Sequence, residues 1–261
     1  MKIYPNGQSI SNRKLVKWGI DPTGNRLHLG HFAAIRFLRK MLAEYRDVVV
    51  VIGDLTATIG DPSGTIKERP ILSREIVDDN TSRLEEQIKK LLPGARTIRN
   101  RNLITSVPLL LSMLGKLTAS KLLDRSAFQD RSVRADELIV PVLQAIDSIA
   151  LGAELEVGGE DQEFNFAITR LLQQEIGQRP EICVMIPIIR GTDGNKMSKS
   201  LNNCVWLDAS DIHGKIMAIH DDVMDEWIPS LTDIHFADDP AYAHPKARKE
   251  ALARAIIDQL K

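Results

Sequence analysis

A run of β-branched apolar residues from Val48 to Ile52 constrains the fold of this chain more than any other feature. A strand without alternating polar residues must be covered on both faces, as the central strands of parallel sheets are. Another apolar run, Leu15 to Ile20, precedes it, and the intervening Phe32 to Tyr45 carries apolar side chains at helical spacing. This strand–helix–strand order predicts an α/β fold built on a parallel sheet.

The rest of the chain continues the alternation of strands and helices, with one interruption. The later expected elements are a helix from its cap at Ser73 to about Leu92, a strand near Thr97–Ile98, a strand over Glu154–Val157, a helix over Phe164–Gln174 and a last strand over Ile182–Ile189. Residues 103–151 have helical character and are predicted to form a helical insertion between strands.

Length and charge limit what this protein can be. The chain has 261 residues, which suits one large α/β domain with a small appendage. Its formal net charge of −1 gives no global attraction for nucleic acid or anionic membrane, so a polyanion must meet a local basic patch. Cys183 and Cys204 are too few for a disulfide framework, and no apolar run reaches membrane-spanning length. We therefore expect a cytoplasmic protein with no membrane contact.

The segment from Gly19 to His31 joins the first predicted strand to the first predicted helix through a turn that suits phosphate. Helix N-termini attract phosphate through their N–H groups and the helix dipole. His28 and His31 are three residues apart and should share one face of the first helical turn, with Gly30 leaving room between them. Two solvated histidines at a helix start would give the same pattern, so this motif alone does not decide the function.

Three glycine-containing polar segments follow predicted strands. Gly53–Thr56 and Ile59–Gly64 come after the Val48–Ile52 run, at the carboxyl end of a strand, where open α/β sheets bind ligands. Gly158–Gln162 is a glycine turn that opens into a helix, with an acidic residue placed to meet a ribose diol. These positions predict a nucleotide site at one edge of the sheet.

A polar face on an otherwise apolar helix is a further candidate for a functional site. Val140, Gln144 and Asp147 lie at i, i+4 and i+7, so they share one face of that helix. A buried amide and a buried carboxylate need partners, because burying them unpaired is costly. The face therefore indicates either a structural hydrogen-bond network or a ligand pocket.

The pentapeptide Lys196-Met197-Ser198-Lys199-Ser200 follows a glycine-flanked loop after the last predicted strand. Two lysines three residues apart on such a loop can swing onto a polyphosphate and neutralise charge that develops there. A solvated basic loop is the alternative for any two lysines. Taken together with His28-Leu29-Gly30-His31, the pentapeptide resembles the paired HIGH and KMSKS signatures of the class I aminoacyl-tRNA synthetases.

Within that class, the chain resembles the tyrosyl-tRNA synthetases of bacterial type. The segments that carry this resemblance are Gly19–Thr23, Ile59–Gly64, Leu143–Asp147, Gly158–Gln162 and Gly214–Met217. The resemblance implies a Rossmann-type catalytic domain over residues 1–211, with a helical insertion at about 103–151 and part of a helical anticodon-binding domain over 212–261. It also implies that an amino acid, with tyrosine favoured, reacts with ATP and its Mg²⁺ to an aminoacyl-adenylate that passes to tRNA. No dedicated protein site for the metal is expected.

The family's motifs assign roles to three groups of residues. Those that would carry the catalytic step are Thr23 and His28 at the γ-phosphate end of ATP, His31 near the ribose, and Lys196 and Lys199 on the departing pyrophosphate. Those that would contact ATP are Gly19, Asp21, Gly30, Gly159, Asp161, Met197 and Ser198. Those that would bind the amino acid are Thr56 and Val140, with Asp61 and Gln144 at the α-amino group, Asp147 at the phenol hydroxyl, and Gln162 at the carboxylate.

Departures from the family pattern leave alternatives open. Val140 stands where the family usually has tyrosine, and Ile146 stands where it has a larger or aromatic residue. The family's C-terminal RNA-binding module and part of its N-terminal segment have no counterpart in the 261 residues. The alternatives are a synthetase fragment, a stand-alone paralogue that passes the adenylate to a carrier protein or metabolite, and a non-catalytic RNA-binding relative. The retained histidines and lysines argue against the last of these.

The resemblance further implies a homodimer. The segment from about residue 117 to 131 looks like the family's dimer-forming insertion. Leu122, Leu123 and Phe128 are expected to supply its apolar surface, because a monomer needs no such patch.

Overall fold

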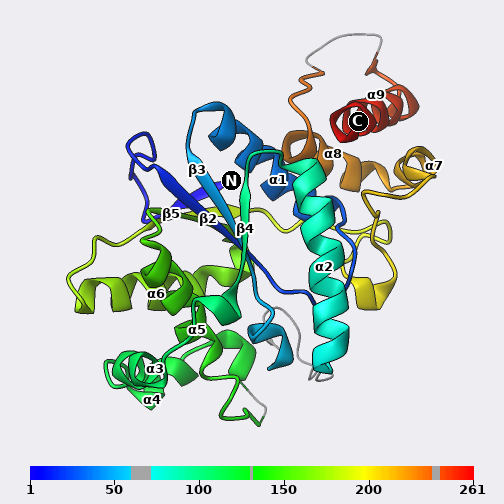
Figure 1. Ribbon diagram of the computed structural model, residues 1–261. Helices are drawn as coiled ribbons and strands as arrows, with labels where there is room; N and C mark the ends of the chain where they lie inside the picture. Colours follow the sequence, from blue (N-terminus) through cyan, green and yellow to red (C-terminus); the bar gives the residue numbers. More distant parts are fainter. Residues whose placement is uncertain (60–71, 130–131, 237–241) are drawn as a thin grey trace. The chain divides into compact units, whose positions relative to one another are not determined.

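The computed structural model describes residues 1–59, 72–129, 132–236 and 242–261. The chain forms two compact units, which we call unit 1 and unit 2 (Figure 1). Unit 1 comprises residues 1–25 and 40–186, and unit 2 comprises residues 26–39 and 187–261. No helix in the described ranges is both long enough and apolar enough to cross a membrane.

Unit 1 is built on a six-stranded sheet. Its strands are β1 (Lys2–Tyr4), β2 (Leu15–Ile20), β3 (Asp47–Ile52), β4 (Arg96–Arg99), β5 (Leu155–Gly159) and β6 (Ile182–Ile186), and their order across the sheet is β1-β6-β5-β2-β3-β4. Every pairing is parallel except that of β1 with β6. The predicted α/β fold is therefore confirmed. The three-residue edge strand β1 was not predicted, because it contains no apolar run.

The strand order places a topological switch beside β2. The chain runs from β2 to β3 and β4 on one side, and from β5 to β6 on the other. Because crossovers between parallel strands are right-handed, helices on connections that run in opposite directions cover opposite faces of the sheet. In Figure 1, α2 accordingly lies on one side of the sheet, and α5 and α6 lie together on the other. Ligands of open α/β sheets bind at such a switch, outside the carboxyl ends of the strands.

The helices agree with the predicted order. They are α1 (Leu29–Ala43), α2 (Arg74–Leu91), α3 (Val107–Leu114), α4 (Ala119–Leu123), α5 (Val140–Leu151), α6 (Glu163–Glu175), α7 (Ile212–Met217), α8 (Asp221–Leu231) and α9 (Pro245–Leu260). Short 3₁₀ turns follow several strands and loops: η1 (Thr56–Thr58), η2 (Asn100–Asn102), η3 (Ser126–Phe128), η4 (Glu160–Gln162) and η5 (Lys199–Leu201). The Ser73 hydroxyl accepts from the Ile76 backbone N–H at 3.4 Å, which confirms it as the cap of α2.

Some predicted boundaries were wrong. The last strand ends at Ile186 and not at Ile189, because Pro187 lacks the N–H that would continue the ladder. Helix α1 begins at Leu29, so His28 lies immediately before the helix and only His31 lies in its first turn. The helical insertion over 103–151 is confirmed as helical, but it is divided into α3, α4 and α5 by loops.

The helical insertion packs on α6 through an apolar cluster. Its buried members are Met113, Leu122, Val142, Ala145, Ile146, Ile168 and Leu172. Ile146 is 1% exposed and belongs to this cluster, so its departure from the family pattern concerns packing between helices. Leu122 and Phe128 are also buried, at 7% and 6% exposure, which makes the prediction that they offer surface wrong. Leu123, at 48%, is exposed as predicted.

Unit 2 has its own core around α8. Trp227 is fully buried and donates its indole N–H to the Arg190 carbonyl at 2.9 Å. Helix α9 packs against α7 and α8. The Arg36 guanidinium of α1 donates to the Gln259 side chain at 2.8 Å and pairs with Asp233 at 2.7 Å, so the first part of α1 belongs with these C-terminal helices. The helical C-terminal appendage is therefore confirmed.

Candidate functional site

In unit 1, predicted site residues gather at the carboxyl ends of β2 and β3. Asp21 follows β2, and its Oδ1 accepts a hydrogen bond from the Thr56 hydroxyl at 2.7 Å. Both side chains lie directly against Gly53, where a Cβ would collide with them. Gly53 is therefore required by the close approach of Asp21 and Thr56. Thr23 follows in the same turn, and its N–H bonds to the Asp21 carbonyl at 2.8 Å.

The neighbouring strand β5 ends in the predicted glycine turn. A Cβ on Gly159 would collide with the Asp161 carboxylate, so this backbone and that carboxylate lie against each other. Gly158 in turn leaves room for the Phe166 ring, which a Cβ would approach to 2.8 Å. Gly19 in β2 is exposed, and no other group of the described residues lies within 4 Å of the space that its Cβ would fill. At Gly19 the backbone near the carboxyl end of β2 is therefore accessible.

The polar face of α5 has the predicted spacing, and most of it is buried. Val140 and Asp147 are 3% and 4% exposed, whereas Gln144 is half-buried. One oxygen of Asp147, Oδ1, is buried and has no hydrogen-bond partner among the described residues. Burial raises the pKa of Asp147 to about 7, although Lys17 and a hydrogen bond from Asn100 oppose this shift. An unpaired buried acceptor is costly, so this oxygen is placed to receive a donor from a ligand or a water.

Sequence reasoning missed the charged residues beneath this face. Lys17 of β2 and Glu156 of β5 are register partners in adjacent strands, and both are at most 1% exposed. Their ammonium and carboxylate groups are 2.9 Å apart. The available signal was the presence of charged residues inside two predicted strands of a parallel sheet, since such positions are normally apolar.

In unit 2, the rings of His28 and His31 lie in contact at the start of α1, tilted by 38°. Their ring centroids are 3.9 Å apart. His28 Nδ1 accepts from the Gly30 N–H, and His31 Nδ1 accepts from the His28 N–H, both at 3.1 Å. A Cβ on Gly30 would lie 2.9 Å from the His28 ring, which explains the glycine. Because Nδ1 of each ring is an acceptor, a neutral ring carries its proton on Nε2.

Both imidazoles are neutral at physiological pH. Burial, and secondarily Lys199, lowers the pKa of His28 to about 3. Burial, His28 and Lys199 hold the pKa of His31 well below its usual range. The pair therefore offers two Nε2–H donors, which suit phosphate or ribose oxygens and add no positive charge of their own.

The basic loop of residues 196–200 is organised by Asn203, which is 2% exposed. The Asn203 amide donates to Asp193 at 2.7 Å and to the Lys196 carbonyl at 3.1 Å. Its oxygen accepts from the Ser198 N–H at 2.7 Å. Asn203 therefore fixes the backbone that carries Lys196, Met197 and Ser198. Sequence reasoning did not single it out, because an asparagine in a loop has no distinctive spacing.

Within unit 2, the chain that follows this loop is hydrogen-bonded to the histidine turn. The Leu29 N–H bonds to the Val205 carbonyl and the Leu207 N–H to the Leu27 carbonyl, both at 2.9 Å. Met197 is buried, and its sulfur lies 3.9 Å from the Cβ position of Gly30. Two motifs far apart in the sequence, the histidine turn and the lysine loop, thus form one local structure.

The predicted residues are therefore divided between two local sites. Those described in unit 1 are Gly19, Asp21, Thr23, Thr56, Val140, Gln144, Asp147, Gly159, Asp161 and Gln162. Those in unit 2 are His28, Gly30, His31, Lys196, Met197, Ser198 and Lys199. Asp61 lies outside the described residues. No group of three or more His, Cys, Asp or Glu side chains within the described ranges could hold a metal ion.

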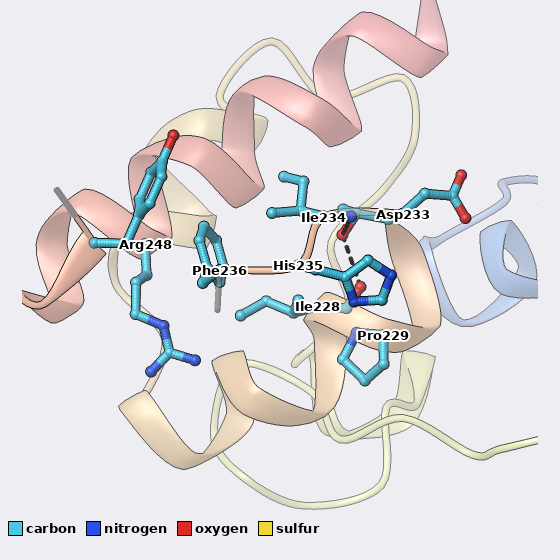
Figure 2. A pocket seen from close by; sticks show the side chains of 9 residues that line it. Ile228, Pro229, Asp233, Ile234, His235, Phe236 and Arg248 are labelled. Carbon is cyan, nitrogen blue, oxygen red and sulfur yellow. Dashed lines mark hydrogen bonds between the residues drawn. The ribbon is translucent and has the colours of Figure 1, made fainter. Parts of the chain in front are cut away.

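A cavity of about 660 Å³ lies elsewhere in unit 2 (Figure 2). It is lined by Ile228, Pro229, Thr232, Asp233, Ile234, His235, Phe236, Tyr242 and Arg248. None of the predicted site residues lines it.

Comparison with known proteins defines the class. The protein-family model described as tRNA synthetases class I (W and Y) matches residues 11–238. The chain belongs to this family, and its sheet and helices have the Rossmann-type fold of class I synthetases.

Individual relatives agree with this assignment. The tyrosine–tRNA ligase of Aquifex aeolicus is 38% identical over 257 residues, which are 93% of this chain and 66% of that protein. The tyrosine–tRNA ligase of Thermotoga maritima is 39% identical over 84% of this chain and 58% of that protein. The chain thus spans less than two thirds of the length of these two relatives. The solved tyrosyl-tRNA synthetase of Archaeoglobus fulgidus has a TM-score of 0.76 at 19% identity, over 95% of this chain and 88% of that one.

The buried carboxyl of Asp147 predicts a pH-dependent stability. Its pKa of about 7 in the folded protein lies above its ordinary 3.8, so the folded state binds more protons between these values and stability falls as pH rises. Asp147→Asn should therefore stabilise the protein relative to wild type by an amount that grows between about pH 4 and pH 8, on the order of 3 kcal/mol. Denaturant unfolding at several pH values measures this. The exposed Asp79→Asn is the control, and a pH-independent difference for Asp147→Asn would contradict the prediction.

Proposed function

We propose that this protein activates tyrosine with ATP and Mg²⁺ to tyrosyl-adenylate and transfers the tyrosyl group to tRNA. The observation that carries the proposal is the joint structure of the histidine turn and the lysine loop in unit 2. Tyrosine–tRNA ligases that are 38–39% identical to this chain support it. The alternative acceptors considered from the sequence, a carrier protein or a metabolite, have no observation in their favour.

The proposed chemistry divides between the two units. In unit 1, Asp21, Gly159 and Asp161 are proposed to hold the nucleoside, while Gln144 and Gln162 bind the α-amino and carboxylate groups of the amino acid. The amino-acid carboxylate oxygen attacks the α-phosphorus, and the bond from this phosphorus to the oxygen bridging to the β-phosphate breaks, releasing pyrophosphate. This in-line displacement needs placement and charge neutralisation, with no covalent enzyme intermediate.

In unit 2, the proposed groups act on the polyphosphate. The Nε2–H groups of His28 and His31 donate hydrogen bonds to ATP oxygens, and Thr23 of unit 1 is assigned to the γ-phosphate end. Lys196 and Lys199 neutralise the charge that grows on the departing pyrophosphate. The metal ion would enter with ATP and would neutralise charge on its phosphates.

The domain assignment remains our proposal. We assign the catalytic role to residues 1–211 and an anticodon-binding role to the helices over 212–261. Val140 supplies no polar group at the α-amino end, where the family usually has tyrosine, so the proposed pocket binds that end through Gln144 and Asp61 alone. We also propose a homodimer through about residues 117–131, with Leu123 and, on the adjacent α3, Val107 and Leu111 as the exposed apolar side chains.

Removing the charge of the lysine loop tests the adenylation step. Lys199→Ala should lower the rate of tyrosine-dependent ATP–pyrophosphate exchange by about 10²–10³, since the charge it meets develops only in the transition state. The KM for tyrosine should change little. The exposed Lys90→Ala is the matched control. A lysine variant with normal exchange, or with only weaker tyrosine binding, would argue against the proposed role.

Substrate choice tests the role of Asp147. A site that pairs a hydroxyl rejects the analogue that lacks it, by about 10⁴–10⁵ in the strongest cases. Tyrosine should be activated far better than phenylalanine, and Asp147→Ala should remove most of this preference by lowering kcat/KM for tyrosine. The value for phenylalanine serves as the internal control, because it should change far less. Wild-type preference for phenylalanine or for a non-aromatic amino acid would refute the assignment of tyrosine.

Oligomeric state tests the proposed homodimer. The wild-type protein should sediment as a dimer at micromolar concentration, and Leu123→Lys should shift it toward monomer by placing a charge in an apolar interface. Ile176→Lys, at an exposed apolar position outside the proposed interface, is the matched control. A wild-type monomer in sedimentation velocity would exclude the dimer.

A further inference from the structure

Three buried ionisable residues and a buried serine lie beneath the α5 face that carries Gln144. We call this set the charge cluster, and it consists of Lys17, Ser148, Glu156 and Glu181. All four are at most 1% exposed. The Lys17 ammonium has three acceptors: the Gln144 carbonyl at 3.0 Å, the Ser148 hydroxyl at 2.7 Å and Glu156 Oε1 at 2.9 Å. Its hydrogen-bonding capacity is therefore fully used.

Within the cluster, Glu156 is the carboxylate and Glu181 the carboxylic acid. Lys17 and several hydrogen bonds hold the pKa of Glu156 below its usual range despite its burial. Burial and the neighbouring Glu156 raise the pKa of Glu181 well above its usual range. Two adjacent buried carboxyls share one proton in this way, because both cannot be charged. Glu156 thus acts only as an acceptor.

This acceptor determines how the Gln144 side chain is oriented. Gln144 Nε2 lies 3.0 Å from Glu156 Oε1, and an ionised carboxylate can accept from the amide nitrogen but cannot donate to the amide oxygen. The opposite orientation would place two oxygens against each other in a buried site. Gln144 Oε1 is therefore turned away from Glu156, where it accepts from Asn165 Nδ2 at 2.9 Å.

The orientation continues through Asn165 to Gln162. Asn165 is fully buried, and its Nδ2 also donates to Gln162 Oε1 at 2.8 Å. Both hydrogens of this amide are then used on the two glutamine oxygens. Gln144, Asn165 and Gln162 form a chain of side-chain amides. The direction of this chain, meaning which end of each amide donates and which accepts, follows from the charged acceptor Glu156 at its start. We call this chain the amide relay.

We propose that the Lys17–Glu156 ion pair sets the direction of the amide relay and thereby orients the Gln144 amide for the α-amino group of the amino acid. With this direction, Gln144 Nε2 is used on Glu156, and Gln144 Oε1 is the atom that can accept from an ammonium in addition to Asn165. Lys17 and Glu156 are positioning residues, and the inference rests on the amino-acid role proposed above for Gln144.

The ion pair is not needed for stability alone. A buried ion pair can usually be replaced by neutral side chains of similar volume without loss of stability, because desolvation of both charges offsets their attraction. A neutral pair would, however, leave the amide direction undetermined, since a glutamine at position 156 could donate or accept. The charge therefore supplies orientation, which neutral packing cannot supply.

Reversing the pair tests the proposal. Lys17→Glu combined with Glu156→Lys keeps both charges but places a donor where Gln144 now meets an acceptor. Lys17→Met combined with Glu156→Gln removes both charges and is the second variant if the reversed pair does not fold. Each folded variant should raise the KM for tyrosine by about tenfold or more, with the KM for ATP unchanged, because a misdirected amide loses a charge-assisted hydrogen bond. The control is Glu181→Gln, which keeps a neutral side chain of similar size at that position, and it should leave the KM for tyrosine within about twofold of wild type.

A readout without catalysis separates this proposal from the proposed function. In protein labelled with ¹⁵N-glutamine, the side-chain N–H signal of Gln144 should have the chemical shift of a proton donated to a carboxylate. Both double variants should lose this chemical shift. Glu181→Gln should keep it. A wild-type protein that activates no amino acid would refute the proposed function but leave this signal to test the relay. A folded double variant with an unchanged Gln144 signal, or with a changed signal and an unchanged KM for tyrosine, would overturn the inference.

Discussion

The position of β2 between β3 and β5 is the constraint on which the rest of unit 1 depends. Because β2 pairs in parallel with both neighbours, the turns after all three strands open at the same edge of the sheet. This places Asp21 against Gly53 at the end of β3 and brings the glycine turn of β5 beside β2. The same pairing puts Lys17 opposite Glu156. The grouping of these turns and the buried charges beneath the Gln144 face of α5 are thus consequences of one strand pairing.

In unit 2, burial sets the protonation state of two histidines. Its two histidines are kept neutral by desolvation, so they act as directed N–H donors and leave the positive charge to the lysines of the neighbouring loop. Asn203 restrains that loop at its backbone, while the lysine side chains remain the groups proposed to meet phosphate. Separating neutral donors from charged side chains would suit the proposed reaction, in which charge grows on the leaving group.

Much of this architecture could be predicted from the sequence, since local patterns determine it. The run from Val48 to Ile52 predicted a central parallel strand, and Ser73 predicted the start of a helix, because each depends on the chemistry of near neighbours. Errors arose where burial depends on distant segments. Leu122 and Phe128 were expected to be surface residues, but both are buried, and Leu122 is covered by helices built from residues elsewhere in the chain.

The sequence by itself determined the alternation of strands and helices, the phosphate and amino-acid motifs and, through those motifs, the family. Only the tertiary structure decided which protonation states and orientations these residues have. The raised pKa of Asp147, the neutral state of His28 and the direction of the Gln144 amide all follow from desolvation and from partners distant in the chain. A motif specifies which groups are present, whereas the dielectric environment and hydrogen-bond partners that set their behaviour exist only once the chain has packed.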